Sequence, residues 1–324
     1  MSITNKIKKF ISSLIHDSIK SAFGLFKVMI PIVIVIKILQ DSGLINYVAM
    51  PLKPIMGLMG LPAETGLVWA GAIVNNIYTG LIIFVSFGDQ ISLSQHQATV
   101  LGAMMLVAHA LPLESAVSKK AGARFLFQAL ARMAGAITLG IILHMVYSAG
   151  DMLTQPATIL FPATLQQDTS TMAWVLGQAK NFGGIFVVIM ALLTIMRLLT
   201  LFGIIELLNK MLRPILKAIG IGAKASAITV IGLTIGLTYG GSLIINEARS
   251  GTLEKEDIFY SVTLMGLSHA LIEDTFTVTL LGAHFSGILW GRFLFSLVAV
   301  AILVRVVRLL PSSFCNRFLW TEPS

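Results

Sequence analysis

Apolar residues occur in long runs along this chain, and polar residues are confined to short clusters between them. A run of about 20 apolar residues is long enough to cross the hydrocarbon core of a bilayer. Residues 126–146 and 182–208 meet this length, and 291–307 comes close to it. The pattern predicts an all-α polytopic membrane protein.

The same pattern occurs twice, at an offset of 160 residues and without a gap. The offset superimposes glycines, prolines and charged residues, such as Gly43 on Gly203, Pro54 on Pro214, Gly80 on Gly240, Gly122 on Gly282 and Arg132 on Arg292. Matches of this kind are rarer by chance than matches between apolar residues. We therefore divide the chain into repeat 1 (21–150) and repeat 2 (181–310), joined by a linker (151–180).

Each repeat predicts the same succession of elements. A long apolar helix is followed by a short segment with a basic residue before proline, a glycine-rich apolar segment, a segment with a polar heptapeptide, and a closing helix. In repeat 1 these are 21–48, 50–60, 65–87, 97–120 and 123–148; in repeat 2 they are 181–208, 210–220, 225–247, 257–280 and 284–310.

The basic clusters indicate how these elements sit in the membrane. If the heptapeptide segment crossed the bilayer, Lys119, Lys120 and Arg124 would lie outside, against the positive-inside rule. If it enters and returns as a re-entrant helical hairpin, each repeat has about three crossings and the basic clusters fall inside. The linker then falls outside. An odd number of crossings makes the repeats inverted, an architecture of many secondary transporters.

The two ends of the chain are assigned to the cytoplasmic side. Apolar residues recur at helical spacing in residues 1–20, with lysines on the other faces, so we expect an amphipathic helix on the membrane surface. The alternative is a leader to the first membrane helix. Residues 311–324 form a basic cytoplasmic tail. The expected location is the bacterial inner membrane.

Two polar heptapeptides carry the candidate chemistry: HALPLES (109–115) and HALIEDT (269–275). Pro112 lacks an amide hydrogen and predicts a helix break. The adjacent acids of the second heptapeptide are costly in hydrocarbon unless they face a wet cavity or a partner. We expect two hairpin tips that meet in the interior and present His109, Glu114, Ser115, His269, Glu273, Asp274 and Thr275. The histidines are equally compatible with a purely structural role.

A second set of polar residues lies in the glycine-rich segments. Their side chains both donate and accept hydrogen bonds, which suits a neutral polar ligand. Packing between helices is the alternative role. The candidates are Asn75, Asn76, Tyr78 and Thr79 in repeat 1, and Thr238, Tyr239 and Asn246 in repeat 2.

Composition and motifs exclude several functions. Only 12% of residues are charged and 56% are apolar, and the net charge of +8 resides in clusters that set membrane orientation, so we expect no nucleic-acid partner. The single cysteine, Cys315, excludes an intramolecular disulfide and a thiolate metal cluster within one chain. Hydrolase and phosphate-loop motifs are absent, so we do not expect an enzyme, and we assign no cofactor or metal.

The second heptapeptide and the residues that follow it resemble a known family. SHALIEDTFTVTLLGAHFSGILWGRFLF resembles the gate, or nucleoside-recognition, domain of spore maturation membrane proteins and of the membrane part of ferrous-iron transporters. It is also similar to part of the concentrative nucleoside transporters. The resemblance implies helical hairpins and broken helices around a central site that includes Glu273, Asp274 and Thr275, and by the repeat Glu114 and Ser115. The chain lacks the GTP-binding domain and membrane cysteines of the iron transporters.

The leading hypothesis is a secondary transporter of a small polar solute, with a nucleoside-like molecule as the first choice and a proton or cation coupled through the carboxylates. Its partners would be the lipid bilayer, the solute and further copies of the chain in a homo-oligomer. The alternatives are a membrane scaffold that transports nothing, and a divalent metal-ion permease that uses the histidines and acids.

Overall fold

The computed structural model describes residues 3–87, 91–160 and 170–322, although not the side chains of 3–10, 46, 238 and 239. These ranges are helical and contain no β-strand. The predicted all-α class is therefore confirmed. In the first half the helices are α1 (Ile3–Asp41), α2 (Ile45–Ala49), α3 (Lys53–Leu58), α4 (Thr65–Val74), α5 (Ile77–Phe87), α6 (Gln95–Ala108), α7 (Leu111–Ala121) and α8 (Phe125–Ala149).

The second half follows the same order. Its helices are α9 (Thr171–Leu201), α10 (Ile204–Ile219), α11 (Ala223–Ile235), α12 (Leu237–Arg249), α13 (Lys255–Ser268), α14 (Glu273–Thr279), α15 (Arg292–Leu309) and α16 (Ser312–Phe318), with a π-helical turn at Ser286–Gly291 before α15. Helices α6 and α13 begin and end at positions that differ by 160 residues. The offset seen in the sequence therefore recurs in the helix boundaries.

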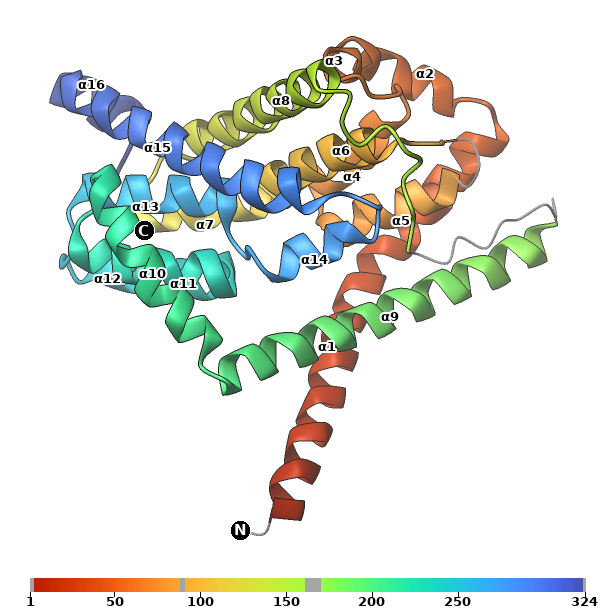
Figure 1. The fold of residues 1–324 in the computed structure, drawn as a ribbon, viewed down its shortest axis with the longest axis horizontal. Coiled ribbons are helices and arrows are strands. Elements are labelled where there is room, and N and C mark those ends of the chain that lie inside the picture. The colour runs from red at the N-terminus through yellow and green to blue at the C-terminus, as the bar shows by residue number, and fades with distance from the viewer. Residues whose placement is uncertain (1–2, 88–90, 161–169, 323–324) are drawn as a thin grey trace.

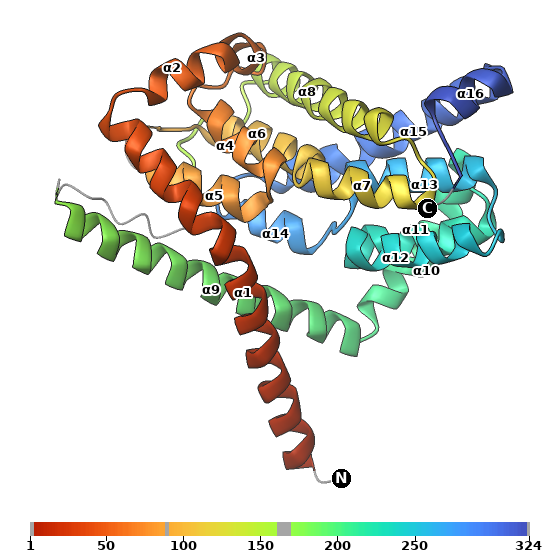
Figure 2. The same ribbon diagram turned by 180° about the vertical axis from the view of Figure 1, so that it is seen from behind.

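Two equivalent pairs of helices, α6–α7 and α13–α14, run in opposite directions. The pair α6–α7 crosses the centre of the molecule from one side, and α13–α14 crosses from the other, as Figures 1 and 2 show from front and back. Helix α13 contacts both α6 and α7, and α14 contacts α6, so the two pairs lie side by side. Helices α8 and α15 run toward opposite sides of the molecule and cross at an angle (Figure 1).

Four of the predicted long segments are broken near their middle. The breaks separate α4 from α5, α6 from α7, α11 from α12, and α13 from α14. Gly236 makes the third break with φ 115° and ψ 166°, a conformation that is essentially restricted to glycine. The breaks in the two heptapeptide segments were predicted, whereas the two glycine-rich segments were predicted as single elements and are pairs of half-helices.

Helix α1 differs from the expectation of a separate surface helix. It runs without a boundary at residue 20 and includes Pro31 in its interior. Of the apolar positions that gave the amphipathic pattern, those in residues 3–10 lie outside the described side chains, and Ile11, Ile15 and Ile19 are exposed. Helix α1 crosses α9, and the two contact each other over part of their length (Figures 1 and 2). Their buried contact includes an edge-to-face pair of Phe26 and Phe182.

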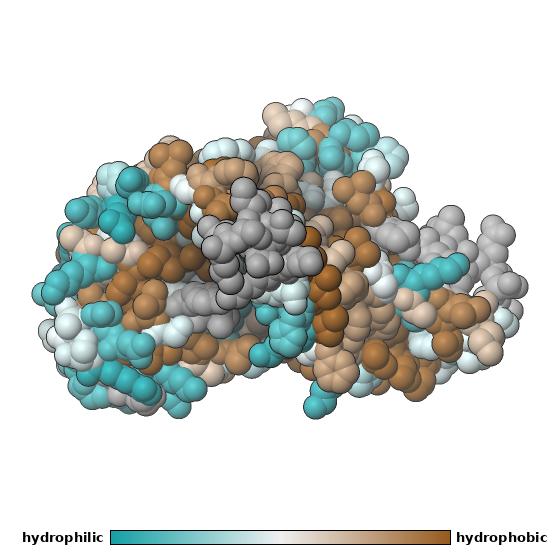
Figure 3. Space-filling view, turned by 90° about the horizontal axis from the view of Figure 1, so that it is seen from below, coloured by the Kyte–Doolittle hydropathy of each residue, from teal (hydrophilic) through white to brown (hydrophobic). Residues whose placement is uncertain are grey.

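The outer surface carries many exposed apolar side chains. On the crossing helices α1 and α9, Phe23 is 74% exposed and Leu201 is also 74% exposed. Among the described residues, five helices are long and apolar enough to cross a membrane: Ile11–Asp41, Gln95–Ala121, Phe125–Ala149, Thr171–Leu201 and Ser286–Leu309. Figure 3 shows apolar surface across much of one face, with hydrophilic residues at its left edge. An exposed apolar surface of this extent is suited to lipid.

Candidate central binding site

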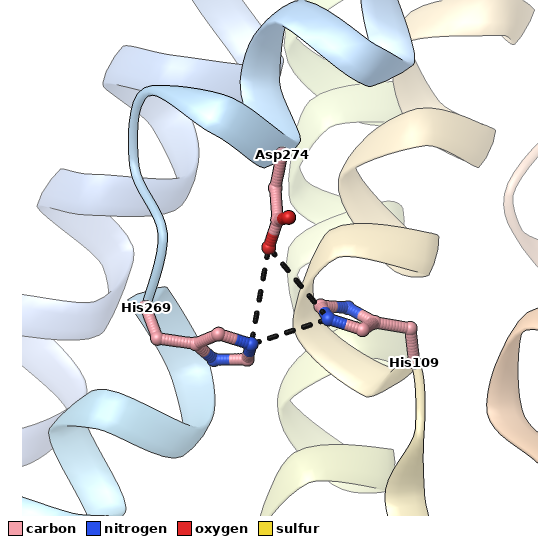
Figure 4. A group of neighbouring side chains, drawn as sticks. All are labelled: His109, His269 and Asp274. Carbon is pink, nitrogen blue, oxygen red and sulfur yellow. Dashed lines mark hydrogen bonds and ion pairs between the residues drawn. The ribbon is translucent and has the colours of Figure 1, made fainter. Parts of the chain in front are cut away.

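The two polar heptapeptides meet in the interior. His109 ends α6, His269 ends α13, and their imidazole Nε2 atoms lie 3.2 Å apart (Figure 4). Both histidines are buried, with 5% and 3% of their surfaces exposed. The residues that the repeat placed at equivalent positions therefore face each other across the boundary between the two halves.

The chain takes the same unusual turn after each histidine. Ala110 and Ala270 both have φ 45°, in the left-handed region that costs a non-glycine residue about 1 kcal/mol. Backbone hydrogen bonds hold the two turns against α4 and α11. The amide of Ala110 donates to the carbonyl of Ala72 at 2.9 Å, and the amide of Leu271 donates to that of Leu233 at 2.8 Å.

Proline does not explain these turns. Pro112 lies in the first turn of α7, a position where proline starts a helix, and the second turn forms without any proline. The break at HALPLES occurs as predicted, but the explanation by Pro112 can apply only to repeat 1. A shared cause must act in both halves.

Two buried arginines supply that shared cause. Arg132 donates from Nε to the carbonyl of Val107 at 2.9 Å and from Nη2 to that of His109 at 2.7 Å. Arg292 repeats this with Leu267 at 3.1 Å and His269 at 2.7 Å. Carbonyls at a helix C-terminus have no partner within the helix, and here guanidinium groups satisfy them. Each arginine thus stabilises the end of one helix and positions the histidine there.

Backbone contacts also fix the state of each imidazole ring. Nδ1 of His109 lies 3.1 Å from the carbonyl of Met105, and Nδ1 of His269 lies 2.8 Å from that of Met265. A carbonyl only accepts, so we assign the proton of each neutral ring to Nδ1. Each Nε2 then presents a lone pair to the centre of the cluster. The histidines have the structural partners that the alternative hypothesis required, and they leave one ring nitrogen each for a ligand.

Two carboxylates complete this central cluster, which we define as His109, His269, Glu114 and Asp274. Oε1 of Glu114 lies 3.4 Å from Nε2 of His109 and 3.1 Å from Nε2 of His269. Oδ2 of Asp274 lies 3.6 and 3.8 Å from the same two atoms. Both acids lie in the first turn of a helix, where the helix dipole favours negative charge.

The two carboxylates have different ionic partners. Glu114 forms an ion pair with Arg132 at 2.5 Å between Oε2 and Nη1. Asp274 forms no ion pair with lysine or arginine within the described ranges, and its Oδ2 finds no hydrogen-bond donor there. The charge of Glu114 is therefore neutralised by Arg132, whereas Oδ2 of Asp274 remains an acceptor without a donor among the described residues.

The cluster opens into a cavity of about 530 Å³, called here the central cavity. Residues from all four helix breaks line it, and the break between α11 and α12 contributes Gly236. The polar lining residues at the other three breaks are Asn75, Asn76, His109, Glu114, His269, Glu273 and Asp274. A second cavity of about 1050 Å³ lies against α1 and α9, and it shares Ile235 and Glu273 with the first. The side chain of Glu273 thus lies at the boundary between the two cavities.

The other predicted residues of repeat 1 lie near this cavity. Asn76 accepts a hydrogen bond from the amide of Thr79 at 2.9 Å, and the Asn75 amide donates to the Thr79 hydroxyl at 2.5 Å. The Tyr78 hydroxyl contacts the side chain of Thr277. Ser115 is buried, and no described residue hydrogen-bonds to its hydroxyl.

The predicted residues of repeat 2 are placed less uniformly. Thr275 is buried in α14 and its hydroxyl lacks a hydrogen-bond partner among the residues described. Thr238 and Tyr239 belong to α12, but their side chains lie outside the described residues. Asn246 is exposed on α12 and is not part of the cavity lining.

Sequence reasoning missed the positioning role of Arg132 and Arg292. Both were visible as a matched pair in the repeat, and both lie in apolar helices, where an arginine requires a partner. The sequence did not show which carbonyls they bind.

The helical fold, the candidate spans and the buried polar centre define a membrane protein. The chain is 24% identical over 281 residues to a Bacillus subtilis protein named "Uncharacterized membrane protein YvoD", an alignment that covers 85% of this chain and 88% of that protein. No known family profile matches the chain, and no solved structure matches it.

Proposed function

We propose that the protein is a secondary transporter of a small polar solute, with its binding site at the central cluster. One observation carries this proposal: four helix breaks surround a single cavity that contains a buried group of ionisable side chains. Broken helices around a site at the interface of two repeats are typical of secondary transporters.

The proposed architecture is a pair of inverted repeats with re-entrant hairpins α6–α7 and α13–α14. It is supported by the antiparallel course of these pairs (Figure 2) and by the equivalent arginine contacts in the two halves. Non-helical backbone at membrane depth is tolerated only where protein or a water-filled cavity covers it. The turns at Ala110 and Ala270 are covered in this way, because both residues are buried and line the central cavity.

The proposed cargo is a nucleoside-like or other small polar molecule. The central cavity lies in the volume range of about 300–1,000 Å³ that is usual for small-molecule sites. The amides of Asn75 and Asn76 line it beside the carboxylates and can both donate and accept hydrogen bonds. Glu114 and Asp274 would couple the movement of a proton or a cation to that of the solute.

In this proposal the second cavity, beside α1 and α9, is the access route. It shares Glu273 and Ile235 with the central cavity, so a small movement of these side chains would join the two spaces. The protein would reside in the bacterial inner membrane with both termini in the cytoplasm. Assembly into a homo-oligomer stays a prediction.

Uptake into proteoliposomes tests the proposal, with a panel of radiolabelled nucleosides and other small polar solutes. We expect saturable uptake that is lost in Glu114→Gln and in Asp274→Asn. The matched control is Glu206→Gln, which removes an exposed carboxylate on α10, and it should retain the wild-type flux. Flux that survives both site variants would contradict the site, and absence of flux for every solute would favour a scaffold.

A further inference from the structure

We propose that His109, His269 and Asp274 bind one divalent transition-metal ion of borderline softness, such as Zn²⁺ or Co²⁺. The inference names the ion class of the site used in the proposed function and rests on that placement of the site. Figure 4 shows the three side chains converging from α6, α13 and α14. Their ligand atoms all lie within 4.8 Å of one another.

The direction of the hydrogen bonds first indicates a cation. Nδ1 of each histidine donates to a main-chain carbonyl, so both Nε2 atoms are acceptors, yet they lie 3.2 Å apart. Oδ2 of Asp274 and Oε1 of Glu114 are also acceptors and lie within 4 Å of these nitrogens. Lone pairs that face each other in a buried site repel unless a positive charge lies between them.

The distances then match a metal ion. Zinc lies about 2.0–2.2 Å from imidazole nitrogen and carboxylate oxygen, so tetrahedral geometry separates its ligand atoms by about 3.3–3.6 Å. The three separations here are 3.2, 3.6 and 3.8 Å. A triangle with these sides has its centre about 2.1 Å from each corner, so an ion displaced from that plane toward a fourth ligand would lie about 2.2 Å from each, at the upper end of zinc bond lengths.

The surroundings of the ligands resemble those of a built metal site. Histidine ligands usually donate their second ring nitrogen to a carbonyl or carboxylate, which fixes the ring and its tautomer. Both histidines do so here, and Arg132 and Arg292 in turn hold the carbonyls of His109 and His269. The ligands would need little rearrangement to receive the ion.

Charge and ligand type define the ion class. Arg132 neutralises Glu114, whereas Asp274 and Glu273 form no ion pair with lysine or arginine among the described residues. Arg292 is also buried and offsets one of these two carboxylates electrostatically, so one net negative charge remains to balance part of the divalent charge. Two imidazoles with one carboxylate favour zinc, cobalt or nickel, while magnesium and calcium prefer oxygen ligands alone. A fourth ligand position of the ion remains beside Oε1 of Glu114 and the central cavity. A water molecule or a solute atom would occupy it.

A second histidine pair is a competing site for a metal ion, so the experiment removes it. Nδ1 of His144 lies 3.1 Å from Nε2 of His96 at the junction of α6 and α8, away from the central cluster. No carboxylate joins this pair in the part of the chain that the structure describes. Binding is therefore measured in the full-length His96→Gln/His144→Gln background, so that the central cluster supplies the histidine pair under study.

The test is equilibrium dialysis of the detergent-solubilised protein with Zn²⁺, followed by X-ray absorption and Co²⁺ visible spectroscopy. We expect one ion per chain in the control background, two imidazoles in its first shell, and tetrahedral Co²⁺ bands. His269→Gln and Asp274→Asn in that background should lower the affinity by about tenfold or more. Gel filtration and thermal unfolding establish that each variant is folded.

Three outcomes would overturn the inference. They are no ion bound in the control background, an affinity unchanged by either ligand variant, and a first shell without imidazole. A protonated histidine pair would give the first of these. Binding is measured without any flux, so the metal site and the transport proposal can fail independently. A folded protein that binds Zn²⁺ but transports nothing would retain this site and reject only the transporter.

Discussion

The Nε2 atoms of His109 and His269 lie 3.2 Å apart, although 160 residues separate them in the chain. Each ring is held by the carbonyl four residues earlier, and each following alanine has φ 45°. The contact therefore joins two copies of one local structure. Their ionic partners differ, because Glu114 pairs with Arg132 while Asp274 has no arginine in ion-pair contact among the described residues.

This difference predicts unequal effects of the two arginines. Arg132→Gln and Arg292→Gln each remove two hydrogen bonds to carbonyls, but only Arg132→Gln leaves a buried carboxylate without its ion-pair partner. Breaking a buried ion pair from one side costs about 3–5 kcal/mol. We expect the midpoint of thermal unfolding in detergent to fall further for Arg132→Gln than for Arg292→Gln.

A double variant isolates the ion pair. Adding Glu114→Gln to Arg132→Gln should recover part of the lost stability, because the unpaired charge is removed with it. Adding it to Arg292→Gln should recover nothing. Purely additive losses in both backgrounds would show that the Arg132–Glu114 pair does not distinguish the two halves.

A second prediction concerns the break between α11 and α12. Gly236→Ala forces alanine into a backbone conformation with φ 115°, so we expect a loss of about 1–3 kcal/mol and disordered cavity walls. Gly183→Ala on α9 is the control, since an added methyl meets nothing within 4 Å and the backbone is helical. The control should gain about 0.5–1 kcal/mol. Equal unfolding midpoints for the two variants would contradict the role of Gly236.

The neighbouring amides Asn75 and Asn76 should act differently. The carbonyl oxygen of Asn76 accepts from the amide of Thr79 at the start of α5, as a helix cap does. Asn76→Ala should therefore cost about 1 kcal/mol of stability. Asn75 donates to the Thr79 hydroxyl and lines the cavity, so Asn75→Ala should mainly weaken solute binding. Isothermal titration calorimetry with the solute measures its affinity, and thermal unfolding measures stability. Equal affinities and equal unfolding midpoints for the two variants would refute the distinction.

Topology gives a fourth prediction. In a Cys315→Ser background, which removes the single native cysteine, Lys120→Cys places one thiol in the last turn of α7 and Leu160→Cys places one in the linker. Both positions are exposed. Re-entrant hairpins put these thiols on opposite sides of the membrane, so a membrane-impermeant maleimide added to intact cells should label only Leu160→Cys. Labelling of both positions from one side would reject the inverted repeats.

Much of the fold could be read from the chain. The 160-residue offset predicted equivalent elements in both halves, and α6 and α13 begin and end at equivalent positions. Hydrophobic runs predicted the apolar helices because burial in lipid requires continuous apolar length. The polar heptapeptides pointed to His109, Glu114, His269 and Asp274 because such residues are costly in hydrocarbon without partners.

Other features depended on contacts between distant segments. The course of α1 through residue 20 is not encoded by any local signal, and the turn at Ala270 forms without a proline or glycine. Arg292 stabilises this turn by donating hydrogen bonds to the carbonyls of Leu267 and His269, which lie 25 and 23 residues earlier in the chain. A local pattern shows that an arginine needs a partner, but not where the folded chain brings one.

The sequence by itself determined that this is a helical membrane protein with an internal repeat and two polar interruptions. The length of an apolar run and the free-energy cost of polar residues within it depend on the local sequence alone. The tertiary structure decided that the two histidines meet through their Nε2 atoms, that two arginines hold the turns, and that Oδ2 of Asp274 has no hydrogen-bond donor among the described residues. Those features arise from the packing of α6–α7 against α13–α14, which run in opposite directions, and only the folded chain creates that contact.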